Sequence, residues 1–440
     1  MEDPRLSRMY VKLLAGNLAK RRQRLWRWMR ENRSSVLALL AVGALLVFLV
    51  GYIAHLHGRF RRLKTELKAM GTTQVELPPM PGGQEAVVMQ RTLLAEGTTP
   101  EFLSATLLPG RGLNVLQIML SVPGRGAIPL LAAPSLEDAA KLMPGVETDA
   151  NGVQSLRLGS PIEAPWGGFV SGAPGIDPAQ ISAVWHGRPL FFPVNDHEGE
   201  TALSRGGLLL KTEADSVKQN VLPDGGTVQG SFVASNFGGR WPSQTSISVT
   251  ALLSSRAFDL KLVARNEGKE PVPFGLGWRP QLLFPGGTRT GVKLRLPAEG
   301  REEIRDGRAT GKLSPVSGTS LDFTDRAGKL LRDLDLDDTF VDLRSGFLDN
   351  GPVLELRDPR SGIGIRMTAM TPQVRAVHVH SARGDNKITI GFQTNYDDPF
   401  SRVWASDDFG GINVLQPGQT LQWRIRMEVF ATSENSKPTL

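Results

Sequence analysis

The sequence predicts an all-β fold, a large antiparallel β-sandwich, preceded by a single transmembrane α-helix. Beyond residue 85 apolar and polar residues alternate with a period of two, which is typical of half-buried antiparallel strands. The clearest runs are Ser246–Leu253, Phe258–Val263, Gly362–Thr368 and Leu421–Val429. Glycine and proline clusters separate such runs, and only Ser135–Leu142 has the pattern of a short helix. Many strands with little helix indicate a sandwich or a barrel.

The transmembrane helix is predicted from residues 34–56, a stretch without any charged side chain. Residues 34–54 alone would form a helix of about 30 Å, the thickness of the hydrocarbon core of a bilayer. Seven Lys or Arg residues precede the stretch at positions 20–33, and five follow it at positions 59–68. Since the more basic flank stays inside, we expect a single-pass protein of a bacterial-type inner membrane, with a cytoplasmic N-terminus and a periplasmic C-terminal domain.

These patterns divide the chain into four segments. Residues 1–33 are a basic, amphipathic cytoplasmic segment, either a helix on the membrane surface or a solvated tail. Residues 34–56 are the transmembrane helix. Residues 57–84 continue as a juxtamembrane helix and a linker rich in proline and glycine. Residues 85–440 form the β-sandwich, and a segment of this length is ample for one large core.

The distribution of charge excludes a nucleic-acid partner. The formal net charge is +7, but residues 1–84 hold 15 basic and 5 acidic residues, and the rest of the chain holds 36 basic and 39 acidic residues. The excess of basic residues therefore belongs to the predicted anchor, where it suits anionic lipid head groups. The chain has no cysteine, so it can form neither a disulfide nor a thiolate metal site. We expect no cofactor.

One block of sequence resembles a known family. In Leu260–Pro285 a strand ends in Asn266, a turn follows, and a second strand presents Gly277-Trp278-Arg279-Pro280. This block resembles the aldose 1-epimerase (galactose mutarotase) family, in which a strand ending in Asn and a Gly-x-His-Pro-Tyr-Phe segment deliver the catalytic histidine. Further segments resemble the family in the same order, namely Trp185–Asn195, Asp337–Phe340, Ile390–Phe400 and Leu415–Phe430. The resemblance covers roughly residues 100–432 and implies a galactose-mutarotase-like sandwich with the sugar in a cleft on one sheet.

The family's reaction requires a carboxylate base at the anomeric hydroxyl and an imidazolium acid at the ring oxygen. In this sequence Arg279 stands at the position of the acid and Gln393 at the position of the glutamate base. Arg205 aligns with a second family histidine, and Asp196 replaces the arginine of an Asn-Arg pair. A guanidinium does not give up its proton and an amide is no base, so both catalytic positions are predicted to be replaced. The predicted ligand-binding residues are Asn195, Arg205, Arg279, Asp337 and Gln393.

Other side chains leave alternatives open. His378 and His380 share one face of a strand, where they could bind zinc, supply an acid or remain exposed strand histidines; we predict no metal. Asp397 or Asp398 could replace the missing base. Asp196-His197-Glu198 is expected to form a turn that is either solvated or binds a cation. The arginines at 205 and 279 either make the cleft cationic, suited to a carboxylate or phosphate, or pair with local carboxylates such as Asp337.

The sequence therefore predicts a membrane-anchored pseudoenzyme. It would serve as an accessory subunit of an inner-membrane protein complex or as a carbohydrate-binding module, with the lipid bilayer, that complex and a carbohydrate as partners. The alternative is an active periplasmic aldose 1-epimerase that interconverts sugar anomers through displaced residues.

Overall fold

The computed structural model describes residues 78–92, 97–145, 151–404 and 411–432. The predicted cytoplasmic segment and transmembrane helix lie outside these ranges, and within them no helix is long and apolar enough to cross a membrane. The chain from Pro78 onward forms a compact unit of its own. Every ladder between its described strands is antiparallel, as the sequence predicts.

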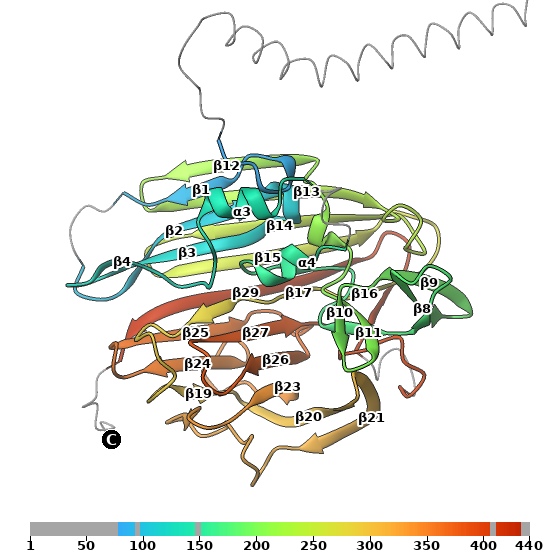
Figure 1. The fold of residues 1–440 in the computed structure, drawn as a ribbon. Helices are drawn as coiled ribbons and strands as arrows, with labels where there is room; N and C mark the ends of the chain where they lie inside the picture. The colour runs from blue at the N-terminus through green and yellow to red at the C-terminus, as the bar shows by residue number, and fades with distance from the viewer. Residues whose placement is uncertain (1–77, 93–96, 146–150, 405–410, 433–440) are drawn as a thin grey trace, which may run out of the picture. The chain divides into compact units, whose positions relative to one another are not determined.

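The largest sheet has nine strands, and its four longest strands run side by side in Figure 1. In spatial order they are β12 (Ser216–Leu222), β13 (Gly225–Ser235), β14 (Thr245–Leu253), β15 (Ala257–Asn266), β29 (Thr420–Ala431), β25 (Ile363–Ala369), β24 (Val353–Asp358), β19 (Lys293–Arg295) and β22 (Lys329–Leu330). Four of these strands, β14, β15, β25 and β29, contain the runs of alternating residues from which strands were predicted.

A second sheet of eight strands carries Asp337 and Gln393 of the predicted site, and Arg279 directly follows one of its strands. Its spatial order is β21 (Arg308–Pro315), β20 (Ala298–Arg305), β23 (Leu336–Leu343), β26 (Ala376–Ser381), β27 (Lys387–Gln393), β17 (Gly277–Trp278) and β5 (Ile162–Glu163), with β18 (Gln281–Leu283) also paired to β27. Since side chains alternate along a strand, Val377 and Val379 of β26 enter the core while His378 and His380 lie on the opposite face.

A third sheet of four strands lies at the N-terminal end of the compact unit. It contains β1 (Val87–Gln90), β2 (Glu101–Leu108), β3 (Asn114–Val122) and β4 (Gly126–Pro129) in sequence order. The two Pro-Gly-Arg-Gly segments connect β2 to β3 and β3 to β4, so both are hairpin connections. In the first, Gly112 has φ of +64° and a Cβ there would lie 2.5 Å from the carbonyl oxygen of Leu209, so only glycine fits.

The three sheets share one hydrophobic core. Leu260 and Trp423 contribute from the nine-stranded sheet, Phe392 from the eight-stranded sheet, and Phe102 and Ile118 from the four-stranded sheet. Each of these side chains is at most 1% exposed. Burial of an aliphatic or aromatic side chain contributes about 1.5–3 kcal/mol, so this continuous core holds the sheets together as a sandwich.

Shorter elements connect the sheets. They are the helices α3 (Leu136–Leu142) and α4 (Val153–Arg157), the 3₁₀ turns at Pro81–Gly83, Pro109–Arg111 and Leu209–Lys211, and the strands β6 (Phe169–Ser171), β7 (Ala173–Pro174), β8 (Gln180–Trp185), β9 (Arg188–Pro193), β10 (Asp196–Glu198), β11 (Thr201–Arg205), β16 (Val272–Phe274) and β28 (Asn413–Leu415). The predicted helix over 135–142 is confirmed as α3, whose N-cap Ser135 accepts a hydrogen bond from the Asp138 N–H.

Candidate functional site

A cleft of about 410 Å³ lies between the β10–β11 hairpin, α4 and the polar face of the eight-stranded sheet. This volume falls in the range of about 300–1,000 Å³ that is usual for small-molecule sites. Of the predicted ligand-binding residues, all except Gln393 line it. The complete lining is Val153, Leu156, Arg157, Asn195, Asp196, His197, Glu198, Arg205, Arg279, Asp337, His378 and His380.

Strand register brings the polar side chains of the sheet together. Asp337 of β23 lies opposite His380 of β26, and Thr339 lies opposite His378. On the other side of β26, His378 lies opposite Gly391 of β27. Because residues two apart on a strand share a face, this pairing gathers two imidazoles and a carboxylate in the cleft, with the buried Thr339 hydroxyl beside His378.

Arg279 follows the short strand β17 and is fixed by a buried carboxylate. Its Nε donates to Glu163 Oε1 at 3.0 Å, and Glu163 is fully buried on β5, the neighbouring strand. Burial raises the pKa of Glu163, and the Arg279 guanidinium offsets only part of that effect. The remaining oxygen of Glu163 accepts the Gly168 N–H. The Nε edge of the Arg279 guanidinium is therefore already bound within the protein by Glu163.

Arg205, the last residue of β11, is a second arginine that lines the cleft. Its Nε donates to Asp196 Oδ2 at 2.6 Å, and the guanidinium lies 5.3 Å from the centroid of the Phe169 ring. Burial lowers the pKa of Arg205, but the ion pair with Asp196 outweighs it, so the pKa is raised and the charge is kept. Asp196-His197-Glu198 forms strand β10, so the expected turn at these residues is wrong.

Asn195 acts on the backbone of the hairpin. Its Oδ1 accepts the Arg205 N–H at 2.8 Å, and its Nδ2 donates to the Arg205 carbonyl at 2.9 Å. This two-way clamp fixes the backbone of Arg205 where the hairpin closes. Asn195 lines the cleft, but both ends of its amide are engaged in holding Arg205 in place.

Asp337 meets two histidines at the open side of the cleft. Its Oδ1 lies 3.3 Å from His378 Nε2 and 3.4 Å from His380 Nδ1. Desolvation acts to raise the pKa of Asp337, but the contacts with the histidines outweigh it, so the pKa lies below its usual range. Both arginines pair with local carboxylates, as one of the two alternatives predicts, but their partners are Asp196 and Glu163 and not Asp337.

His378 is buried, so the expected pair of exposed strand histidines is wrong, and the side chain of His380 is 45% exposed. Burial and the nearby Arg279 charge lower the pKa of His378. The Thr339 hydroxyl donates to Asp397 and lies 3.0 Å from His378 Nδ1, so Nδ1–H donates to Thr339. On the other side of the ring, Nε2 faces the Asp337 carboxylate. Among the residues that the structure describes, no group of three or more His, Cys, Asp or Glu side chains could hold a metal ion.

Gln393 lies under the cleft and does not line it. It is completely buried, its Nε2 lies 3.3 Å from Asp397 Oδ1, and its Oε1 has no protein partner. Asp397 and Asp398 are each 1% exposed and accept hydrogen bonds from the β6 segment at Phe169 and Ser171. Burial raises the pKa of Asp398 to about 6. Neither aspartate reaches the cleft, so the geometry gives no support to a displaced base at 397 or 398.

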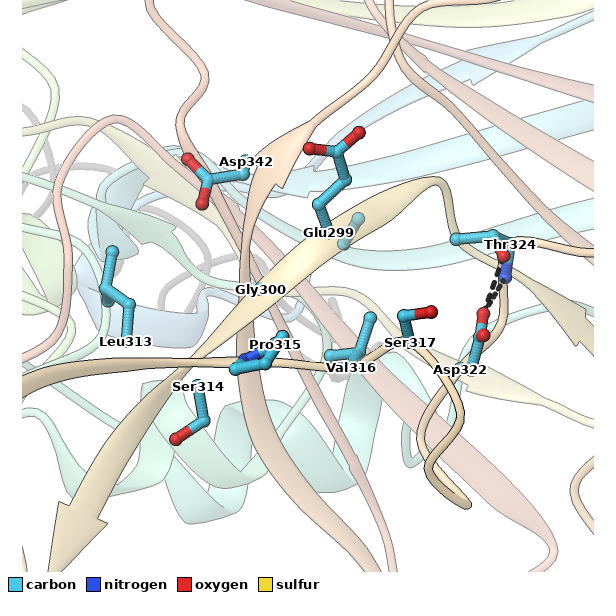
Figure 2. A pocket seen from close by; sticks show the side chains of 11 residues that line it. Glu299, Gly300, Leu313, Ser314, Pro315, Val316, Ser317, Asp322, Thr324 and Asp342 are labelled. Carbon is cyan, nitrogen blue, oxygen red and sulfur yellow. Dashed lines mark hydrogen bonds between the residues drawn. The ribbon is translucent and has the colours of Figure 1, made fainter.

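A second hollow, of about 680 Å³, lies over β20 and β21 and is shown in Figure 2. Its carboxylates are partly engaged within the protein, because Glu299 pairs with Arg344 at 2.6 Å and Asp322 accepts the Thr324 hydroxyl at 2.6 Å. None of the predicted site residues lines it. Although it is larger, it lacks the converging arginine, histidine and carboxylate groups, so we assign the functional site to the smaller cleft.

The sequence did not reveal Glu163, Thr339 or Arg157 as parts of the site. Glu163 lies 116 residues from Arg279 along the chain, and Thr339 lies 39 residues from His378. No local spacing signals such contacts. The alternation in Asp337–Phe340 could have identified Thr339, because residues two apart on a predicted strand share a face.

Packed antiparallel sheets with a polar cleft on one sheet define a mutarotase-like β-sandwich protein. The aldose 1-epimerase family model matches residues 173–428, more than half of the chain, and the chain belongs to this family. The resemblance inferred from sequence motifs is thereby confirmed at the level of the family. No curated protein matches the chain by sequence.

Solved structures share the fold. A galactose mutarotase-like protein from Clostridium acetobutylicum superposes with a TM-score of 0.61 at 14% identity, covering 79% of this chain and 99% of that chain. An aldose epimerase homologue from C. elegans gives 0.59 at 16% identity, with coverage of 79% and 99%. A galactose 1-epimerase from Lactobacillus acidophilus gives 0.54 at 14% identity, again covering 79% and 99%. At these identities the similarity establishes the fold alone.

Proposed function

We propose that this chain is a membrane-anchored, non-catalytic mutarotase-like protein that binds a carbohydrate in the cleft or serves an inner-membrane complex as an accessory subunit. The observation that carries the proposal is the chemistry at two positions. Arg279, at the family's acid position, lies in the cleft with its charge held by Glu163. Gln393, at the family's base position, is a buried amide bonded to Asp397.

These two groups cannot perform the family's proton transfers. A guanidinium stays protonated at any physiological pH, and an amide side chain has no basic atom. Loss of a general acid or base typically lowers the rate by about 10² to 10⁴, and here both positions are affected. The proposal therefore predicts mutarotation at the spontaneous rate.

The cleft still suits a polar ligand. Arginine η nitrogens, the Asp337 carboxylate and the half-buried His380 imidazole supply donors and acceptors of the kind that sugar hydroxyls require. The accessory role is supported by the chain's organisation, since a charge-free span, a basic flank and a large folded domain offer several surfaces to one partner complex.

Polarimetry and ligand binding test the proposal on the full-length protein, purified in a polyoxyethylene detergent because sugar-based detergents would compete for the cleft. With fresh α-D-glucose or α-D-galactose we expect no acceleration of mutarotation. Saturation-transfer NMR against a panel of mono- and oligosaccharides should give a bound glycan. Asp337→Asn should weaken its binding about 10-fold to 100-fold, because a hydrogen bond to a charged group contributes about 1.5–3 kcal/mol.

The matched control is Asp338→Asn. Asp338 is the next residue on β23, points away from the cleft and pairs with Arg301 at 2.7 Å, so its removal should leave glycan binding unchanged. A protein that binds no glycan and remains a monomer without partners in mild detergent would overturn the proposal.

An active aldose 1-epimerase is the second candidate, and one observation favours it. Asp337, His378 and His380 bring a carboxylate and two imidazoles to within 3.4 Å in the cleft, and a carboxylate and an imidazole are the kinds of group that serve the family as base and acid. This candidate predicts accelerated mutarotation that Asp337→Asn abolishes, so the same polarimetry distinguishes the two functions.

A further inference from the structure

The nine-stranded sheet has one face in the core and one face toward solvent. Along β15, Leu260 and Leu262 enter the core while Lys261 is exposed, and along β29, Trp423 and Ile425 enter the core. The register places Lys261 opposite Arg424, so their side chains lie on the same outer face. Neighbouring strands extend this outer face, which we call the outer sheet face, from β12 to β19.

Cations dominate the outer sheet face. The outward positions of β15, β29, β25 and β24 carry Lys261, Arg265, Arg424, Arg426, Arg366 and Arg357. Their only acidic residues are Asp259, Glu428 and Glu355. Lys218 on β12 and Lys293 and Arg295 on β19 add three more positive charges on the same face.

Two of the three acidic residues lie beneath arginines. Asp259 accepts hydrogen bonds from Arg424 and Arg426, each at 2.9 Å, and Glu355 is bound by Arg357 and by Arg366 at 2.8 Å. The side chains of Asp259 and Glu355 are 8% and 2% exposed, whereas those of the four arginines are 33–44% exposed. Each cluster therefore presents two cations to solvent over one shielded anion.

This concentration of positive charge contrasts with the rest of the domain. Residues 85–440 hold 36 basic and 39 acidic residues, so the domain is slightly acidic as a whole. A sheet face that gathers cations and shields its carboxylates, on an otherwise acidic domain, matches a flat, negatively charged partner.

We propose that the outer sheet face docks on the anionic phospholipid head groups of the membrane in which the chain is anchored, an inference that rests on the proposed membrane anchor. Residues 57–77 separate the predicted span from the compact unit, and even fully extended they reach only about 70 Å. Such a tether keeps the face at high effective concentration near the bilayer, so individually weak lysine and arginine contacts are sufficient.

The absence of cysteine makes the test direct. Gln422→Cys places a fluorophore on the outer sheet face, and Ser317→Cys places one on the loop after β21 as a control position. The full-length protein is reconstituted in nanodiscs of phosphatidylcholine alone or with equal phosphatidylglycerol, both containing a head-group spin-labelled quencher lipid. We expect at least 3-fold stronger quenching at position 422 with phosphatidylglycerol, its loss in high salt, and no change at position 317.

Charge reversal supplies the matched variants. Lys218→Glu with Lys261→Glu alters the outer sheet face without breaking either arginine cluster and should return quenching to the phosphatidylcholine level. Arg308→Glu with Lys312→Glu, two exposed cations on β21, should not. Equal quenching in both lipids, or no effect of the first pair, would overturn the docking.

Failure of the anchor gives a different result. A chain that does not remain in phosphatidylcholine discs refutes the anchor, and co-sedimentation of the labelled protein with phosphatidylglycerol vesicles then still decides whether the face binds anionic lipid. If a single-stranded oligonucleotide binds the outer sheet face and phosphatidylglycerol does not, the partner is a soluble polyanion and the proposal fails.

Discussion

Arg279 and Gln393 differ in how they occupy their positions. Arg279 lines the cleft and pairs with the buried carboxyl of Glu163. Gln393 is buried below the surface, where its side chain hydrogen-bonds to Asp397. Replacing one residue would therefore not recreate an acid or a base, because each site now includes partners suited to the residue present. Around Gln393 the network already contains Glu302, whose pKa burial raises well above its usual value.

A carboxylate at position 393 should therefore be costly. Gln393→Glu would place a second carboxylate 3.3 Å from Asp397 in a fully buried site, and two such charges repel. The folded-state pKa of the new carboxyl is raised above its unfolded value near 4.3, so the destabilisation is absent below about pH 4 and grows as pH rises through the raised pKa. At pH 8 we expect a loss of about 2–4 kcal/mol.

Thermal unfolding followed by tryptophan fluorescence at pH 5 and pH 8 measures this effect. Adding Asp397→Asn to Gln393→Glu removes the like charge and should recover most of the stability at pH 8. A Gln393→Glu protein with the same loss at both pH values would show that shape, not charge, decides the residue at this position.

The sequence predicted four of the twelve residues that line the cleft as ligand-binding residues, but not the carboxylate that holds Arg279. Asn195, Arg205, Arg279 and Asp337 were found because a family resemblance ordered the motifs along the chain. The partner of Arg279 could not be found in this way, because the pairing of β5 with β17 brings Glu163 beside it from 116 residues away in the chain. Charge alone could not tell which carboxylate would meet which arginine.

At the scale of elements, two glycines fix the end of β11, where Arg205 lines the cleft. Gly206 and Gly207 follow β11 directly and both have positive φ. At Gly207 the backbone packs against β5, and a Cβ would lie 2.1 Å from the Ala164 carbonyl oxygen. That carbonyl also accepts the Leu208 and Leu209 N–H groups. The turn therefore joins β11, which carries Arg205, to the strand that ends at Glu163.

Gly207→Ala should disturb this junction. Gly187, in the turn between β8 and β9, is the matched control because its φ of +78° is close to the +80° of Gly207, but nothing lies within 4 Å of its missing Cβ. Gly187→Ala should cost about 1–2 kcal/mol from the left-handed backbone alone. Gly207→Ala should cost a further 1–3 kcal/mol, roughly the penalty for overpacking, and should weaken glycan binding through Arg205.

Thermal unfolding of both variants, together with NMR of glycan binding, measures the difference. Equal losses in the two proteins would mean that backbone conformation, rather than the close approach to Ala164, determines the glycine at 207.

At the scale of the whole molecule, the antiparallel β fold followed from periodicity, since an alternating strand pattern needs only local sequence. The pairing order did not follow in the same way: β29 at the C-terminus lies between β15 and β25 in the middle of the nine-stranded sheet. Such an insertion depends on long-range packing of Trp423 and Ile425 in the core, which no local pattern encodes. The predicted membrane span, outside the described residues, remains a prediction.

The membrane topology can be tested with single cysteines in the cysteine-free chain. Ser7→Cys lies in the predicted cytoplasmic segment, and Ser317→Cys is exposed in the folded domain. Because the basic flank at positions 20–33 should hold the N-terminus inside, a membrane-impermeant maleimide added to intact spheroplasts should label position 317 and leave position 7 unlabelled until the cells are permeabilised. The reverse pattern would place the cleft in the cytoplasm, and labelling of both sites after the protein is released by carbonate would show that residues 34–56 do not span the membrane.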